Sequence, residues 1–154
     1  AQPNRDKTTS VSSLGAADEP VGRARPVVYT ISMKRIVIVE DDQLLAAMYK
    51  TKFELAGHKV EVHHTAELAL PELTKESPDL VILDVLLPGK NGLWLLKELH
   101  AGKATVPVVI LTNLAEADFS MPDKLRESLG VVGYHVKTQV TPAEVLKTVQ
   151  EALA

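Results

Sequence analysis

The sequence contains no cysteine among its 154 residues. Disulfide bonds and thiolate metal sites are therefore excluded, which suits a reducing compartment and leads us to expect a cytoplasmic protein. The sequence also lacks any apolar stretch near the roughly 20 residues that span a bilayer, and it lacks the apolar core of a signal peptide near its start. We therefore expect no membrane insertion.

Clustered positive charge is missing as well. Lysine and arginine number 17 against 20 acidic residues, the formal net charge is -3, and no dense basic stripe occurs. Because nucleic-acid phosphates are bound through clustered basic side chains, we expect no nucleic-acid contact by this chain. The apolar content of 45% and the charged content of 24% are typical of a single globular domain.

The first 32 residues differ in composition from the rest of the chain. They are rich in Ser, Thr, Pro, Ala and Gly and show no helix or strand period before Val27. We interpret residues 1–32 as a flexible N-terminal tail or linker and residues 33–154 as the folded domain. Because the chain opens with Ala1 and not with Met, a processed, tagged or excised piece of a longer chain is one interpretation.

From Met33 onward, short apolar runs alternate with helical patterns. This alternation is typical of βα units, and right-handed crossovers then predict an α/β fold with a doubly wound five-stranded parallel sheet. The predicted strands are residues 36–39, 59–63, 80–83, 108–111 and 131–136. Helices are expected after Asp42, from Thr65 to about Lys75, after Gly92, from near Pro122 and after Thr141.

Two of these helices carry detailed signals. In the first, Leu45, Met48, Tyr49 and Phe53 are spaced to form one apolar stripe, which we expect to face the core. In the last, the segment 141–144 combines a capping box with a proline at the first helical position. The segment 113–121 has no clear period, and we expect a mobile loop there.

Polar side chains follow four of the five predicted strands. Glu40 and Asp41 follow the first strand, Asp84 the third, Thr112 the fourth and Lys137 the fifth. Because ligands bind outside the carboxyl ends of parallel strands, we expect these groups to share one pocket. Two carboxylates about 4 Å apart repel by roughly 4 kcal/mol at an effective dielectric near 20. The carboxylates therefore need a cation, and Mg2+ prefers such oxygen ligands beside a phosphoryl group.

The same set of groups suits phosphoryl transfer to a side chain. An aspartate can attack phosphorus and form an acyl phosphate, and we assign that role to Asp84. Mg2+, the Lys137 ammonium and the Thr112 hydroxyl would then each neutralise one phosphoryl oxygen. No general base is required.

These motifs resemble the receiver domain of bacterial two-component response regulators, over residues 33–154. The resemblance implies a flavodoxin-like (βα)5 fold with strand order 2-1-3-4-5. It also implies that Asp84 accepts a phosphoryl group from a phosphohistidine of a sensor histidine kinase or phosphotransfer protein. Mg2+ would be held by Glu40, Asp41, Asp84 and the backbone carbonyl of Leu86.

The resemblance also implies a switch. Thr112 matches the switch hydroxyl, Lys137 the lysine of the motif, and Tyr134 the aromatic position that moves inward when the hydroxyl moves. The surface beside Tyr134 serves for docking or dimerisation in this family, so a phosphorylation-dependent homodimer is one expectation. The effector and the cognate kinase stay open, as does the choice between a stand-alone regulator, a relay intermediate and a fragment.

Three departures from the family pattern carry expectations of their own. Thr138 follows Lys137 where most receivers have proline, and the segment between Thr112 and Lys137 is a few residues longer than in compact members. Leu86 and Leu114 stand where family members modulate water access. Apolar side chains there cannot orient a water molecule, so we expect slow self-dephosphorylation. The resemblance implies no enzyme activity beyond intrinsic self-phosphorylation and this self-dephosphorylation.

Two rival functions remain beside the receiver hypothesis. A receiver-like interaction module that is not phosphorylated is suggested by Thr138 and the longer segment. An aspartyl-phosphate hydrolase would need a second acid two residues after its nucleophile, and Leu86 occupies that position. Phosphorylation of Asp84 separates the first rival from the receiver hypothesis, and turnover of a phosphomonoester would favour the second.

Overall fold

Five short apolar segments form one parallel sheet in the computed structural model, which describes residue 22 and residues 32–102 and 105–154. The strand order is β2-β1-β3-β4-β5, so the predicted doubly wound sheet is confirmed. The strands are β1 (Arg35–Val39), β2 (Lys59–His63), β3 (Leu80–Leu83), β4 (Val108–Thr112) and β5 (Val131–Val136). The prediction of a tail over residues 1–32 falls almost wholly outside the described residues and stays a prediction.

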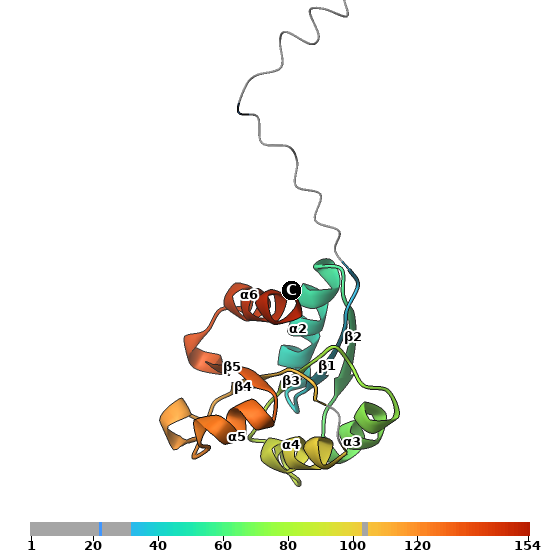
Figure 1. Ribbon diagram of the computed structural model, residues 1–154. Helices are drawn as coiled ribbons and strands as arrows, with labels where there is room; N and C mark the ends of the chain where they lie inside the picture. Colours follow the sequence, from blue (N-terminus) through green and yellow to red (C-terminus); the bar gives the residue numbers. More distant parts are fainter. Residues whose placement is uncertain (1–21, 23–31, 103–104) are drawn as a thin grey trace, which may run out of the picture. The chain divides into compact units, whose positions relative to one another are not determined.

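Helices cover both faces of this sheet. Figure 1 shows α2 and α6 on one face and α3, α4 and α5 on the other. The helices are α2 (Gln43–Leu55), α3 (Ala66–Lys75), α4 (Gly92–Ala101), α5 (Asp123–Ser128) and α6 (Pro142–Leu153). None of the helices within the described residues has the length and apolar character needed to cross a bilayer.

Alternate side chains of each central strand enter two separate cores. Ile36 and Ile38 of β1 pack with Phe53 of α2 and Val149 of α6, while Val37 lies in the cluster on the opposite face. β3 is buried at all four positions because helices cover both of its faces. The continuous apolar runs in the sequence are therefore explained by burial on both sides of the sheet.

Four helices begin with a side-chain cap. The side chains of Asp42, Thr65, Asn91 and Thr141 each accept a hydrogen bond from a backbone N–H of the first helical turn. Such caps satisfy backbone donors that have no partner within the helix. The predicted capping box of α6 is present in full, with the Glu144 side chain accepting from the Thr141 N–H at 2.8 Å.

The predicted apolar stripe of α2 is wrong at one position. Tyr49 and Phe53 are buried, but Met48 is 42% exposed and Leu45 is only partly buried. The stripe against the sheet runs instead through Ala46, Tyr49 and Phe53, at spacings of three and four residues. Met48 lies beside that stripe, because one residue of advance turns a helix by about 100°.

The segment between β4 and α5 contains only a short 3-10 turn, η1 (Glu116–Asp118), so its lack of helical period was informative. Pro122 precedes α5 as its N-cap residue and does not occupy the first helical turn. A second 3-10 turn, η2 (Lys137–Gln139), follows β5 directly. Lys137 is therefore placed at the carboxyl edge of the sheet by a turn that needs no proline at position 138.

Candidate functional site

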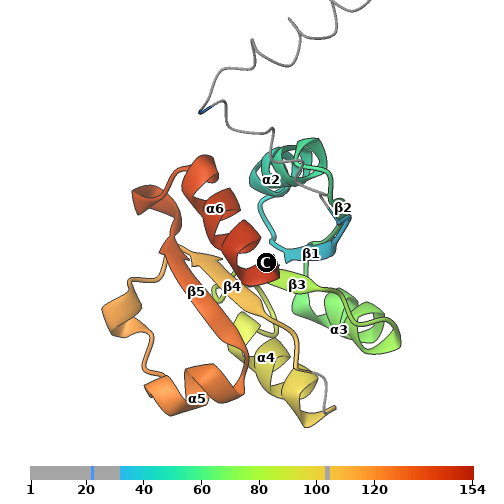
Figure 2. The ribbon, with the colours of Figure 1, turned by 45° about the horizontal axis from the view of Figure 1, so that its top comes forward.

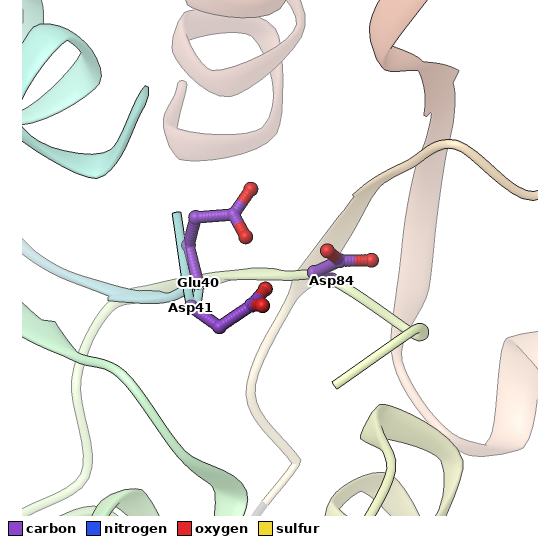
Figure 3. Close-up of side chains that lie close together, drawn as sticks. All are labelled: Glu40, Asp41 and Asp84. Carbon is purple, nitrogen blue, oxygen red and sulfur yellow. The ribbon is translucent and has the colours of Figure 1, made fainter. Parts of the chain in front are cut away.

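Three carboxylates meet at the carboxyl edge of the sheet. One carboxylate oxygen from each of Glu40, Asp41 and Asp84 lies within 4.8 Å of the others, and Figure 3 shows the three side chains close together. Glu40 and Asp84 are each 4% exposed, whereas Asp41 faces solvent. The cluster forms because β1 and β3 are neighbours in register, with Val39 paired to Leu83. The sequence expectation that these residues share a pocket agrees with this geometry.

Lys137 supplies a positive charge to this cluster. Its ammonium donates to Asp84 Oδ2 at 2.7 Å and forms an ion pair with Glu40, and its side chain is only 14% exposed. Burial acts to lower the pKa of Lys137, but its hydrogen bonds to Asp84 and Glu40 outweigh burial and the pKa is raised. The lysine therefore stays charged and joins strands β1, β3 and β5 at the pocket.

Burial disfavours the ionised form of the Glu40 carboxyl. Burial raises the pKa of its carboxyl to about 7, and the nearby Asp84 charge adds to this, although the hydrogen bond from Lys137 acts against both. One ammonium thus fails to compensate two buried carboxylates and a third beside them. A site of this composition favours an additional cation.

The backbone around Asp84 is held tightly. The Leu86 N–H donates to Asp84 Oδ1 at 2.9 Å, which turns the chain back over the carboxylate and places the Leu86 peptide beside the cluster. The Leu86 side chain is 52% exposed. On the other side, the Asp84 N–H continues the sheet by donating to the Val39 carbonyl at 3.1 Å.

Gly92 allows this close packing, which yields a stability prediction. A Cβ at Gly92 would collide with the Asp84 carbonyl oxygen and would lie 2.8 Å from Val85 Cα, and both are backbone atoms that cannot move aside. We expect Gly92→Ala to lower the free energy of unfolding by about 2 kcal/mol or more, as overpacking does. Urea unfolding measures this effect. Gly102→Ala is the control, because its Cβ would meet only the Leu99 carbonyl at 3.5 Å, and an equal loss in both variants would contradict the prediction.

Thr112 and Tyr134 are each hydrogen-bonded to the backbone of Leu114. Thr112 ends β4, is fully buried, and accepts a hydrogen bond from the Leu114 N–H at 3.4 Å. Tyr134 lies in β5, and its hydroxyl donates to the Leu114 carbonyl at 2.7 Å. The backbone of Leu114 therefore links Thr112 and Tyr134, the two predicted switch residues.

Sequence reasoning missed one contact to the acidic loop. The His64 ring lies after β2, and its Nδ1 donates to the Glu40 carbonyl at 2.9 Å. The contact depends on how two loops fold next to each other, 24 residues apart in the chain. No local pattern could have indicated it.

A doubly wound sheet with an acidic pocket and a lysine at its carboxyl edge defines the class of receiver-type α/β domains. The family model of the response regulator receiver domain matches residues 36–151, and the chain belongs to that family. The resemblance noted in the sequence is therefore confirmed, as is the flavodoxin-like strand order.

Individual relatives agree with this placement. The chain is 38% identical to the transcriptional regulatory protein RstA of Escherichia coli over 114 residues, which cover 74% of this chain and 45% of that protein. It is 42% identical to the transcriptional regulatory protein CpxR of Escherichia coli over 80 residues, which cover 52% of this chain and 34% of that protein. The matches thus span less than half the length of these relatives.

Solved structures give the same result. The CheY-like receiver domain protein of Methanospirillum hungatei superposes with a TM-score of 0.70 at 30% identity, covering 79% of this chain and 94% of that chain. The BeF3-activated receiver domain of Klebsiella pneumoniae RstA superposes with a TM-score of 0.65 at 32% identity, covering 77% and 97%. Both solved structures therefore share the fold of this chain over the part that superposes.

Proposed function

We propose that this receiver domain is a phosphoacceptor switch in which Asp84 takes a phosphoryl group from the phosphohistidine of a sensor histidine kinase or phosphotransfer protein. The observation that carries the proposal is the clustering of the Glu40, Asp41 and Asp84 carboxylates, together with the hydrogen bond that Lys137 donates to Asp84. A buried aspartate with an ammonium at 2.7 Å is equipped to bear added negative charge.

The donor set of the pocket fits Mg2+. Receiver domains generally bind this ion at an acidic pocket, and here three carboxylates cluster while the Lys137 ammonium contacts Glu40 and Asp84. Glu40, Asp41, Asp84 and the Leu86 carbonyl would hold the ion, and Mg2+ when bound would neutralise charge on a phosphoryl oxygen. Burial and the Asp84 charge raise the pKa of Glu40, so a bound cation would stabilise its ionised form.

The protein groups would divide the transfer among them. A carboxylate oxygen of Asp84 forms the new bond to phosphorus while the phosphorus–nitrogen bond of the donor histidine breaks, and the electron pair of that bond stays on the imidazole. The Lys137 ammonium, which donates to Asp84 Oδ2 before the transfer, would donate to a phosphoryl oxygen after it. The Thr112 hydroxyl donates its proton to another oxygen, and its Oγ1 can still accept from the Leu114 N–H.

Such a switch acts by favouring one of two arrangements of the same chain. A hydrogen bond from Thr112 to the phosphoryl group would fix the backbone of Leu114 and hence Tyr134, whose hydroxyl donates to the Leu114 carbonyl at 2.7 Å. The surface around Tyr134 would then bind an effector or a second copy of the domain. RstA and CpxR are transcriptional regulatory proteins. From these two relatives we infer only that this domain has a downstream partner.

Phosphorylation by a small donor tests the proposal. Acetyl phosphate with Mg2+ should raise the intact mass by one phosphoryl group, and EDTA should prevent the increase. Absence of any mass increase would favour the interaction module without phosphorylation. Continuous release of phosphate from a small phosphomonoester would favour the hydrolase.

The pKa of Glu40 gives a pH dependence for metal binding. Since this pKa is raised to about 7, the carboxyl is protonated below that pH and Mg2+ must displace its proton. We expect Mg2+ affinity to fall by about tenfold per pH unit below pH 7 and to level off above about pH 8. Titration of Trp94 fluorescence or amide NMR signals measures this. Glu40→Gln should flatten the profile, and an unchanged slope in that variant would contradict the assignment.

The same shift predicts the pH dependence of stability. The folded protein binds the Glu40 proton more tightly than the unfolded chain, whose glutamate pKa is about 4.5. This contribution to stability is therefore present below pH 4.5 and is lost as the pH rises towards 7. Mg2+ should restore it above pH 7.

Apolar neighbours of the pocket predict a long-lived phosphoryl group. Leu86 is 52% exposed beside Asp84, and Leu114 is partly buried beside Thr112. Neither side chain can orient an attacking water. We expect a phosphoryl half-life of minutes or longer in Mg2+ buffer, followed by intact mass after removal of the donor. A half-life of seconds would contradict this expectation.

A further inference from the structure

Arg126, on the short helix α5, contacts both the segment between β4 and α5 and Tyr134 of β5. Its Nη1 forms an ion pair with Glu116 at 2.8 Å, its Nε donates to the Met121 carbonyl at 3.3 Å, and its Nη2 donates to the Phe119 carbonyl at 3.4 Å. The side chain is only 19% exposed. One guanidinium therefore holds three points of the segment between β4 and α5.

The same guanidinium lies over two aromatic rings. Its central carbon is 5.2 Å from the centre of the Phe119 ring and 5.6 Å from that of Tyr134, and the two rings are 5.2 Å apart. A cation within about 6 Å of a ring centre is attracted to the ring face. Tyr134 is thus held by a ring and a cation that both come from outside its own strand.

The other end of Tyr134 leads to the pocket. Its hydroxyl donates to the Leu114 carbonyl at 2.7 Å, and the Leu114 N–H donates to Thr112 Oγ1 at 3.4 Å. A continuous series of contacts therefore runs from Arg126 through Tyr134 and Leu114 to Thr112. Figure 2 shows α5 and β5 side by side next to β4.

We propose that Arg126 is a positioning residue for Tyr134 and, through the Leu114 peptide, for the Thr112 hydroxyl. It stabilises the arrangement in which Thr112 is engaged by Leu114. Thr112 Oγ1 accepts this hydrogen bond and keeps its own proton, so an Oγ1 fixed by Leu114 is preorganised to donate to a phosphoryl oxygen on Asp84. Arg126 therefore favours phosphorylation. This last step rests on the proposed function, whereas the positioning of Tyr134 does not.

Matched variants separate this role from a general effect on folding. Arg126→Met keeps the apolar stem over the rings but removes the charge and the donors. Arg126→Lys restores the charge without the planar fork that reaches several carbonyls at once. Lys124→Met, on the same helix and exposed, removes one positive charge and leaves the contacts of Arg126 in place.

The first test uses the unphosphorylated protein labelled with 3-fluorotyrosine. The chain has three tyrosines, and Tyr134→Phe identifies the Tyr134 fluorine signal. We expect Arg126→Met to shift this signal and the Thr112 amide peak, Arg126→Lys to shift them less, and Lys124→Met to leave both unchanged. The Tyr49 signal should stay in place in every variant, because Tyr49 lies in the core on the other face of the sheet. Unchanged Tyr134 and Thr112 signals in Arg126→Met would overturn the proposal.

The second test measures the rate of labelling by acetyl phosphate. We expect Arg126→Met to be labelled about two- to fivefold more slowly than the wild type, the change that a lost contact of about 1 kcal/mol produces. Equal rates would overturn the coupling to the pocket. A wild type that takes no phosphoryl group would defeat the proposed function, while the fluorine and amide signals would still decide the role of Arg126. If Arg126→Met fails to fold, Glu116→Gln, which weakens the ion pair alone, replaces it in both tests.

Discussion

Asp84→Asn should take up no phosphoryl group from acetyl phosphate and Mg2+, where the wild type gains one. The amide nitrogen of asparagine cannot form the acyl phosphate, and its remaining oxygen is a much weaker nucleophile than a carboxylate. The fold should survive, because asparagine still offers Oδ1 to the Leu86 N–H, which donates to Asp84 at 2.9 Å. Loss of one charge from a crowded cluster should leave the melting temperature equal or higher.

Asp42→Asn is the matched control for this experiment. Asp42 is exposed beside the acidic pair, and its Oδ1 caps α2 by accepting from the Leu45 N–H at 3.1 Å. Asparagine caps helices equally well, so this variant should be labelled like the wild type. Intact mass spectrometry follows both proteins. A phosphoryl group on the Asp84→Asn variant would show that the acceptor lies elsewhere.

Lys137→Met should separate metal binding from phosphoryl transfer. Removing the ammonium leaves Glu40 and Asp84 without their shared counter-charge, so at pH 8 we expect Mg2+ affinity to rise on the order of tenfold. Labelling at saturating Mg2+ should nevertheless slow on the order of tenfold to a hundredfold, because the ammonium no longer stabilises charge on the transferred group.

The metal-free variant should also be less stable. Glu40 and Asp84 are each 4% exposed, and buried carboxylates that lose their partner destabilise a fold strongly. Mg2+ should therefore stabilise Lys137→Met more than it stabilises the wild type, as measured by thermal unfolding with and without the ion. Lys147→Met, an exposed change on α6, is the control. Labelling at the wild-type rate in Lys137→Met would remove the lysine from the proposed mechanism.

Local patterns predicted the elements of this fold well. Alternating apolar runs and helix caps located the five strands and placed the starts of α2, α3 and α6, because both signals depend on residues a few positions apart. The strand order came from the family resemblance and not from these patterns. The error at Met48 arose because a helix buries only the residues nearest to the sheet, and the sequence does not specify how wide that contact is.

The acidic cluster was predictable for a different reason. Residues that directly follow parallel strands emerge at one edge of the sheet, so Glu40, Asp41 and Asp84 had to lie near one another once the fold was known. The sequence did not reveal that Lys137 pairs with both Glu40 and Asp84, or that burial raises the pKa of Glu40 to about 7. Those properties depend on how deeply each side chain is buried and on distances across three strands.

The amino-acid order by itself determined the secondary structure, the parallel sheet and the set of groups at its carboxyl edge, since each follows from short-range spacing and from strand direction. Tertiary structure alone decided which side chains contact one another across elements. The placement of Arg126 over Phe119 and Tyr134 and the contact of His64 with the Glu40 carbonyl are of this kind. Such contacts join loops and helices whose relative positions are set by packing of the whole core, and no local pattern encodes that packing.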